Sequence, residues 1–147
     1  MELLTGEFRN TLDEKGRVSL PARLRAELSG NILILTQGVD RCLWLFQPEQ
    51  WKALSQKLMA TTSPFQARSR LVQRRIIAPA QEVEIDKAGR IAIPQSLREF
   101  SALSRDCVIL GIEKYIELWS ADEYRSYWED NEAEFQAAAE ELGSVLL

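Results

Sequence analysis

The 147-residue sequence contains no histidine and only two cysteines. Histidine is the commonest general base and metal ligand, so its absence excludes serine–histidine and cysteine–histidine catalytic arrangements. Cys42 and Cys107 lie far apart and lack the spacing of a zinc site, which predicts buried free thiols in a reducing compartment and no bound metal. Phosphate-binding loops of the GxxxxGKS/T and GxGxxG types are also missing. We therefore expect no enzyme activity, no cofactor and no small-molecule substrate.

Long apolar runs are missing as well. No segment approaches the roughly 18 apolar residues that cross a bilayer. The first residues, MELLTGEFRN, do not show the basic and then apolar pattern of a secretory signal. The sequence therefore predicts a protein without a secretory signal that does not associate with membranes.

Charge is distributed unevenly, although the formal net charge is only −4. Residues 1–80 hold twelve basic and seven acidic side chains, a balance of +5. Residues 81–147 hold six basic and fifteen acidic side chains, a balance of −9. Halves of opposite sign indicate either a bipolar surface or head-to-tail association, and an acidic total says little about a local basic patch.

One nine-residue pattern occurs twice, as DEKGRVSLP at residues 13–21 and as DKAGRIAIP at residues 86–94. The same offset of 73 positions continues without a gap from Asp13 as far as Trp51, which aligns with Tyr124. Such an offset indicates an internal duplication, and two copies are too few for a solenoid. We expect one pseudo-twofold domain, because each half is too small to bury a core alone.

Both copies predict the same succession of elements: a β-hairpin closed by a glycine turn, a short helix started by proline, two further strands and a closing helix. The first half is expected to contain strands 7–12, 18–20, 32–36 and 42–46 and helices 22–28 and from 48 onward. The second is expected to contain strands 82–85, 91–93, 107–110 and 115–119 and helices 95–100 and from 121 onward. A final acidic helix is predicted over residues 130–142, with Gly143 ending it.

Residues 63–80 have no counterpart in the repeat. We therefore divide the chain into a first half (1–62), a basic linker helix (63–80) and a second half with the acidic helix (81–147). Ser63 and Pro64 predict the start of the linker helix. Its four arginines offer a second nucleic-acid surface, or they form a solvated face while the apolar side packs on the core.

The two turns of the repeat carry the candidate site residues. Arg17 can pair with Asp13, and Arg90 with Asp86, which as an exposed pair would stabilise the fold by roughly 0–1 kcal/mol. Alternatively, the rigid turns present both arginines outward, where a guanidinium forms bidentate bonds to guanine or phosphate. Nearby basic residues are candidate phosphate contacts: Lys15, Arg23, Arg25, Lys87 and Arg98.

The chain resembles the MraZ family over nearly its whole length. The resemblance is carried by GEF-x-N-T-L-D-E-K-G-R-V-S-L-P near the start, R-S-R-L-V-Q-R-R in the middle and E-V-E-I-D-K-A-G-R-I-A-I-P in the second half. The mark of the family is a D-x-x-x-R motif in each half, which Asp13/Arg17 and Asp86/Arg90 match.

This resemblance implies an α+β fold in which both halves form one AbrB-like, swapped-hairpin β-barrel with peripheral helices. It implies ring-shaped homo-oligomers and a cytoplasmic, nucleoid-associated transcription regulator. The regulator would bind short direct repeats in double-stranded DNA upstream of its own operon, in the division and cell-wall gene cluster. Arg17 and Arg90 would be the main DNA readers.

Two other function classes compete with this one. A protein-interaction or assembly module, in which the ring is the purpose, is the alternative, and an enzyme acting through carboxylates is remote. The charge balance adds the hypothesis that the acidic second half faces away from DNA or meets the basic linker helix of a neighbouring copy.

Overall fold

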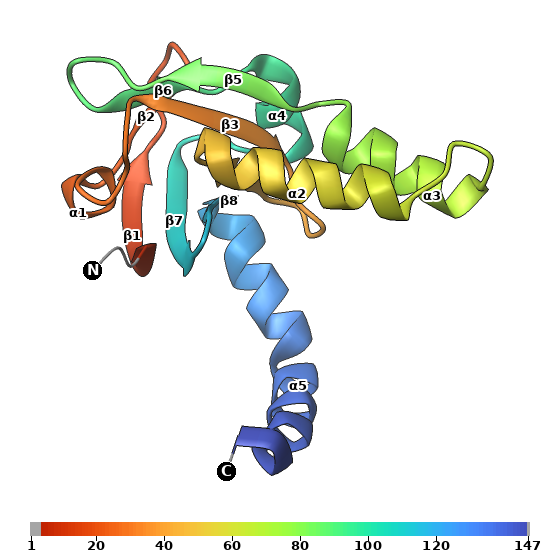
Figure 1. Cartoon of the computed structure of the whole chain (residues 1–147). Coiled ribbons are helices and arrows are strands. Elements are labelled where there is room, and N and C mark those ends of the chain that lie inside the picture. The colour runs from red at the N-terminus through yellow and green to blue at the C-terminus, as the bar shows by residue number, and fades with distance from the viewer. Residues whose placement is uncertain (1–3, 147) are drawn as a thin grey trace.

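Residues 4–146 are described by a computed structural model of the chain (Figure 1). The elements are β1 (Leu4–Thr11), β2 (Arg17–Ser19), α1 (Ala22–Arg25), β3 (Ile32–Gln37), β4 (Leu43–Phe46), α2 (Pro48–Thr61), α3 (Ala67–Val72), the π-helical segment η1 (Gln73–Ile77), β5 (Gln81–Glu84), β6 (Arg90–Ala92), α4 (Gln95–Phe100), β7 (Asp106–Glu113), β8 (Ile116–Ser120) and α5 (Ala121–Leu146). The order β-β-α-β-β-α occurs twice, separated by α3 and η1. The fold is mixed helix and sheet, as predicted.

The strands pair mainly across the boundary between the two halves. Six strands form an antiparallel sheet in the order β1-β7-β8-β4-β3-β5, and β2 pairs with β6 in a separate ribbon. Each predicted hairpin is present only at its turn, because its two strands then separate and pair with other strands. Strand β1 pairs with β7, β5 pairs with β3, and β2 and β6 pair with each other. Among residues 4–146 the sheet does not close into a barrel, since β1 and β5 form its two edges.

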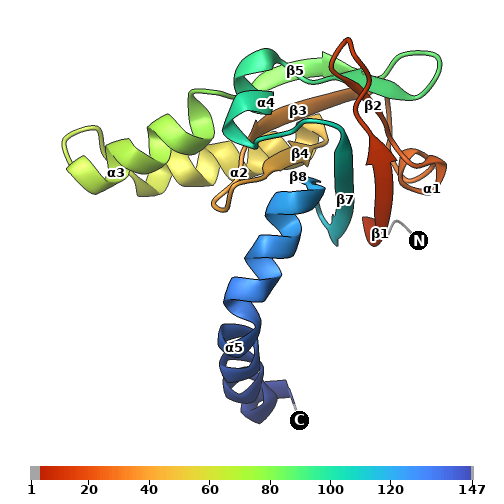
Figure 2. The same ribbon diagram turned by 180° about the vertical axis from the view of Figure 1, so that it is seen from behind.

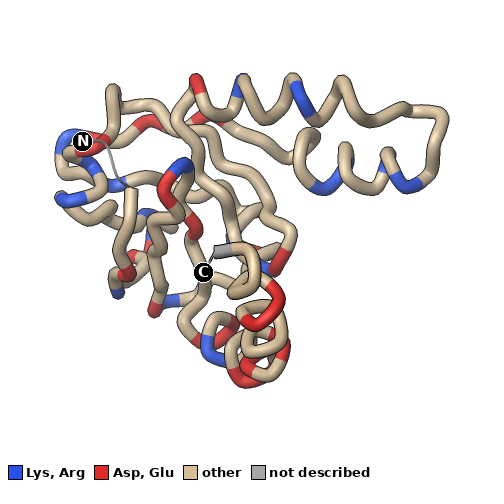
Figure 3. The backbone as a smooth tube through the Cα atoms, turned by 60° about the horizontal axis from the view of Figure 1, so that its bottom comes forward, with Lys and Arg blue, Asp and Glu red and all other residues tan. Residues whose placement is uncertain are grey.

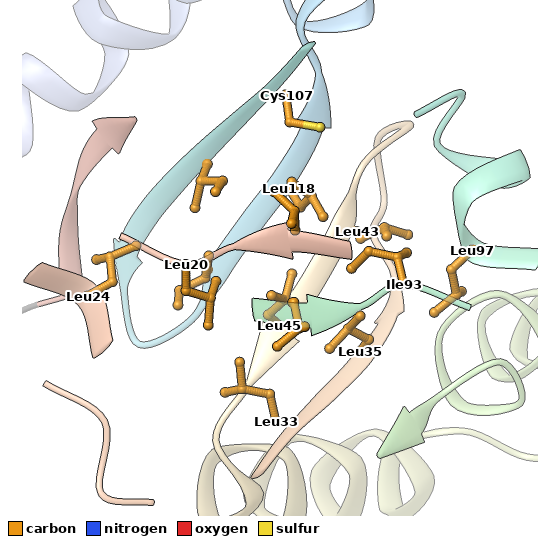
Figure 4. Close-up of a cluster of buried hydrophobic side chains, with 14 of the residues drawn as sticks. Leu20, Leu24, Leu33, Leu35, Leu43, Leu45, Ile93, Leu97, Cys107 and Leu118 are labelled. Atoms are coloured by element: carbon orange, nitrogen blue, oxygen red, sulfur yellow. The ribbon is translucent and has the colours of Figure 1, made fainter. Parts of the chain in front are cut away.

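One hydrophobic core lies between the β2–β6 ribbon and the large sheet. Figure 4 shows Leu20 and Ile93, which directly follow the two ribbon strands, near Leu35 and Leu45 of the sheet. Its fully buried leucine and isoleucine side chains come from both halves: Leu24, Leu33, Leu35, Leu43, Leu45, Ile91, Ile93, Leu97, Ile109, Ile116 and Leu118. Neither half therefore buries this core alone, which agrees with the small size of each half.

The two cysteines are buried free thiols, as the sequence predicts. Burial raises the pKa of the Cys107 thiol to about 11 and raises that of Cys42 further. Both thiols are therefore protonated and poor nucleophiles at neutral pH. Residues 4–146 contain no cluster of acidic or cysteine side chains arranged to hold a metal ion. None of the helices in that range is both long and apolar enough to cross a membrane.

Helices α2 and α3–η1 form a hairpin that projects sideways from the body (Figures 1 and 2). The linker helix begins later than the predicted start at Pro64. It begins at Ala67, because Ser63 Oγ accepts the N–H of Phe65 (3.2 Å) in a turn before the helix. The alternative in which the apolar side of this helix packs on the core holds at only one position. Phe65 is 93% exposed and Leu71 68%, and only Ile76 is buried, because the hairpin extends beyond the sheet.

Polar contacts fix the root of this hairpin to the sheet. Thr36 Oγ1 donates to the carbonyl of Ile76 (2.6 Å) in a buried bond. Arg75 donates through Nε to the Gly38 carbonyl (3.0 Å) and through Nη2 to the next carbonyl along the chain, while its guanidinium lies 4.4 Å above the Phe100 ring. Arg75 therefore stabilises the attachment of the hairpin to the sheet.

Helix α5 is continuous over 26 residues, and the two helices predicted there are parts of it. Ser120 caps the start of this helix, since its Oγ accepts the N–H of Glu123 (3.4 Å). The first turns pack on the sheet where Tyr124 and Tyr127 contact the Trp119 ring. Gly143 does not end the helix, and the later turns extend away from the body (Figures 1 and 2).

Candidate nucleic-acid interface

Each D-x-x-x-R turn is held by the carboxylate of its aspartate. Asp13 Oδ1 accepts the N–H groups of Lys15 and Arg17 (both 2.9 Å), while Oδ2 accepts Arg17 Nε (2.8 Å). Asp86 repeats this pattern with the N–H of Arg90 (2.9 Å) on Oδ1 and Arg90 Nε (3.0 Å) on Oδ2. The two turns therefore present their arginines in the same way.

The backbone N–H of each arginine also sets the charge state of its aspartate. The bond from the Arg17 N–H lowers the pKa of Asp13, and the bond from the Arg90 N–H lowers that of Asp86. Both carboxylates are therefore charged at neutral pH. The carboxylate binds only the Nε side of each guanidinium, and within residues 4–146 neither terminal nitrogen has a hydrogen-bond partner. The predicted ion pairs are present, and they leave both arginines free to bind a further acceptor.

The ribbon brings the two arginines onto one surface. In the β2–β6 register Val18 lies opposite Ile91, and both side chains are buried. Arg17 directly precedes Val18, and Arg90 directly precedes Ile91. Because successive side chains of a strand point to opposite faces, both arginines point to the outer face of the ribbon, where they are diagonal neighbours. Diagonal positions on antiparallel strands are about 7–8 Å apart. Both half-exposed arginines thus belong to a single ribbon face.

The glycine of each turn is covered by an arginine from the other half. Gly16 and Gly89 are buried and have φ angles of +78° and +81°, which L-residues rarely adopt. A Cβ on Gly89 would lie 2.6 Å from Cζ of Arg25, and one on Gly16 would fall within the guanidinium of Arg98. These turns therefore accept only glycine unless the covering arginine moves.

Arg25 and Arg98, two predicted phosphate contacts, also hold the chain of their own half. Arg25 Nε donates to the carbonyl of Leu20 (3.0 Å), and Arg98 Nη1 donates to that of Ile93. Sequence reasoning missed this role, although the signal was present: the two arginines align at the offset of 73. Their role as phosphate contacts remains a prediction.

The other predicted phosphate contacts lie around the same ribbon. Lys15 and Lys87 are exposed in the two turns. Arg23 is exposed in α1, and its Nη2 lies 3.5 Å from Thr5 Oγ1, at the limit of a hydrogen bond. The structure thus places all the predicted site residues on or beside the ribbon, whereas the linker arginines lie on the projecting hairpin (Figure 3).

An apolar cavity of about 380 Å³ lies elsewhere, between α2 and the turn that joins β7 to β8. Aromatic rings form much of its wall, with Phe46 and Tyr115 stacked at 5.5 Å and Trp44 beside them. Glu113 is the one acidic side chain in this lining, so the cavity lacks a pair of carboxylates for acid–base chemistry.

Comparison with known proteins places these features in a family. A family model described as "MraZ protein, putative antitoxin-like" matches residues 3–75 and again residues 76–145. The chain is 54% identical over 142 residues to "Transcriptional regulator MraZ" of Treponema denticola, covering 97% of this chain and 99% of that protein. It is 38% identical to the protein of the same name from Natranaerobius thermophilus, covering 95% and 96%.

Among solved structures, "The solution structure of PHS018 from pyrococcus horikoshii" covers 80% of this chain and 89% of that one. Its TM-score of 0.32 and identity of 16% are too low to bear on the fold.

Proposed function

The chain belongs to the MraZ family of transcriptional regulators, and we propose that it binds short direct repeats in double-stranded DNA upstream of its own operon. The operon would be that of the division and cell-wall gene cluster. The proposal rests on the outer face of the β2–β6 ribbon, where Arg17 and Arg90 are oriented by carboxylates while their terminal nitrogens are free. A two-stranded ribbon fits the major groove, where a guanidinium reads guanine.

Each site residue then has a distinct role. Arg17 and Arg90 read bases, and Asp13 and Asp86 orient them. Phosphates are contacted by the basic residues around the ribbon: Lys15, Arg23, Arg25, Lys87 and Arg98.

The placement of charge supports this orientation on DNA. The ribbon lies at the end of the molecule opposite the far end of α5 (Figures 1 and 2). Helix α5 carries eight acidic residues and one basic residue, a balance of −7. A helix of this length extends about 39 Å, several times the Debye length of about 8 Å at physiological salt. The acidic charge is therefore remote from the DNA surface, and the net charge of −4 does not oppose binding locally.

Assembly is the second part of the proposal. One ribbon presents two reading arginines, a small contact for one DNA site. A homo-oligomeric ring of copies would offer many such ribbons, and linked contacts gain affinity through effective concentration. We include in the proposal the division at residues 1–62, 63–80 and 81–147, a swapped-hairpin origin of the strand pairing shared by both halves, and a cytoplasmic, nucleoid-associated location.

A gel shift tests the proposal against its alternative, a protein-interaction or assembly module. The purified, folded chain is incubated at low salt with DNA from upstream of its own gene and with a shuffled sequence of equal length. We expect a shift of the upstream DNA at lower protein concentration than of the shuffled DNA. If neither DNA shifts, the assembly module becomes the better account.

Substituting both turn aspartates separates orientation from net charge. Asp13→Asn with Asp86→Asn removes two negative charges beside the ribbon, so affinity for shuffled DNA should stay equal or rise. An amide nitrogen facing Nε cannot accept its hydrogen bond, so the arginines lose their alignment and repeat preference should fall roughly 5-fold, the low end for one bidentate contact. Anisotropy titrations on both DNAs measure this ratio. If preference is unchanged, the aspartates do not orient the readers.

A further inference from the structure

Helix α5 presents an apolar stripe along its projecting part. The stripe follows the alternating three- and four-residue spacing of a coiled-coil seam and consists of Trp128, Phe135, Ala138, Leu142 and Val145, with the polar Asn131 at one seam position. Phe135 is 50% exposed, Leu142 56% and Val145 79%. A narrow apolar seam on a helix that leaves the body is typical of a surface that packs against another helix.

Acidic residues border this seam but do not interrupt it. At 100° per residue, the acidic side chains all lie about 70° or more from the line through the seam. Glu132 and Glu134 lie nearest to it, on its two sides. With a balance of −7, the helix requires a partner that offers both apolar and basic side chains.

The α2–α3 hairpin offers both of these features. Residues 48–77 hold six basic residues and one acidic residue, a balance of +5, which Figure 3 shows as blue segments without red neighbours toward the tip. Its exposed large apolar side chains are Met59 (48%), Phe65 (93%), Leu71 (68%) and Val72 (40%).

The hairpin arginines differ in their availability. Arg75 is bound at the root of the hairpin, and Arg70 Nη1 donates to the carbonyl of Pro64 (3.0 Å). Arg68 and Arg74 are exposed and, within residues 4–146, make no hydrogen bond or ion pair. These two are therefore the hairpin arginines most available to an acidic partner.

We propose that the α5 seam of one copy docks on the α2–α3 hairpin of a second copy, head to tail. The inference rests on the homo-oligomer of the proposed function and names its two surfaces. Within one chain the projecting part of α5 and the hairpin point in different directions (Figures 1 and 2), so a second copy must supply the contact. The lengths match, because the 14 residues of α2 and the 17 of α5 after Glu129 span about 21 and 26 Å.

Charge decides between this contact and the pairing of two α5 helices. Two α5 helices side by side would bring two balances of −7 together, whereas α5 on the hairpin joins −7 to +5. A head-to-tail contact uses different surfaces on the two copies, so it continues from copy to copy into a ring or an open filament. A pairing of like helices would instead stop at a dimer.

Paired charge variants of the full chain test the contact by light scattering after size exclusion. The seam variant is Phe135→Asp with Leu142→Asp, and the hairpin variant is Arg68→Glu with Arg74→Glu. We expect the wild type to be an assembly of several copies and both variants to have the mass of one chain, 16.8 kDa. Matched controls are Ala133→Asp with Ala137→Asp on the opposite side of α5, and Arg9→Glu with Arg105→Glu off the hairpin. Both controls should assemble as the wild type does, and circular dichroism reports folding.

Mixing the two variants gives the sharpest result. The hairpin of the seam variant and the seam of the hairpin variant are both unchanged. One contact can therefore form between the two variants, and an equimolar mixture should form one-to-one dimers and no larger species. A hairpin variant that remains assembled while the seam variant dissociates would overturn the proposal in favour of α5 pairing or another occupant. A wild type that is monomeric, or variants that both remain assembled, would also overturn it. Because mass is measured without DNA, the result is independent of whether the ribbon binds repeats.

Discussion

Replacing Arg17 and Arg90 together with alanine is expected to abolish most of the preference for repeat DNA. A bidentate arginine–guanine pair contributes about 1–3 kcal/mol of discrimination, so two independent pairs give about 2–6 kcal/mol, a roughly 30-fold to 10⁴-fold loss of affinity for repeats. Affinity for shuffled DNA should fall much less, because non-specific binding comes from phosphate contacts. Anisotropy titrations of both DNAs at several salt concentrations measure the two effects.

The matched control replaces the two turn lysines. Lys15→Ala with Lys87→Ala should weaken repeat and shuffled DNA alike and make the salt dependence shallower by about one unit of slope per lost phosphate contact. The arginine variant should leave that slope nearly unchanged. If the arginine variant instead behaves as the lysine variant does, Arg17 and Arg90 are phosphate contacts and not readers.

Gly16→Ala is expected to destabilise the fold by several kcal/mol, although it changes a single turn residue. The φ of +78° disfavours any L-residue by about 1–2 kcal/mol. The new Cβ also displaces the guanidinium of Arg98, which loses its charge-assisted bond to the Ile93 carbonyl, worth about 1.5–3 kcal/mol. The free energy of unfolding should therefore drop by about 2–4 kcal/mol in urea titrations, since partial relaxation offsets part of the sum.

Two other glycines provide controls for this substitution. A Cβ added at Gly30 or Gly143 would have no neighbour within 4 Å, and neither glycine has a left-handed φ. Gly30→Ala should change stability by less than about 0.5 kcal/mol, and Gly143→Ala should stabilise α5 by up to about 1 kcal/mol. In an Arg98→Ala background, the loss caused by Gly16→Ala should shrink toward the backbone contribution alone. An equal loss with and without Arg98 would show that the packing over Gly16 contributes nothing.

The local chemistry of the turns could be predicted from the sequence, because it depends on residues within five positions. Asp13 and Arg17 lie close enough along the chain for the pair to follow from turn geometry, and the repeat predicted the same pair at Asp86 and Arg90. The cover of each glycine by an arginine of the other half depends on how two distant segments meet, and no local pattern specifies that. For the same reason the predicted pairing of β1 with β2 and of β5 with β6 was wrong, since strand propensity does not select a partner strand.

The projecting helices show a second limit of sequence reasoning. Apolar spacing correctly indicated one-sided helices, but it does not say whether the apolar side meets the core of the same chain. Inward packing of Phe65 and Leu71 was one of two alternatives, and both side chains are exposed. Gly143 was predicted to end a helix that continues through it. In α5 the later turns are exposed on nearly all sides, so helix propensity maintains the helix there.

Footprinting of the DNA upstream of the gene is the most direct test of the central claim, that the ribbon arginines read repeated sequence. The wild-type chain should protect short, regularly spaced direct repeats, and the Arg17→Ala, Arg90→Ala chain at equal concentration should not. Uniform protection by the wild type, or the same protected repeats with both chains, would contradict the account.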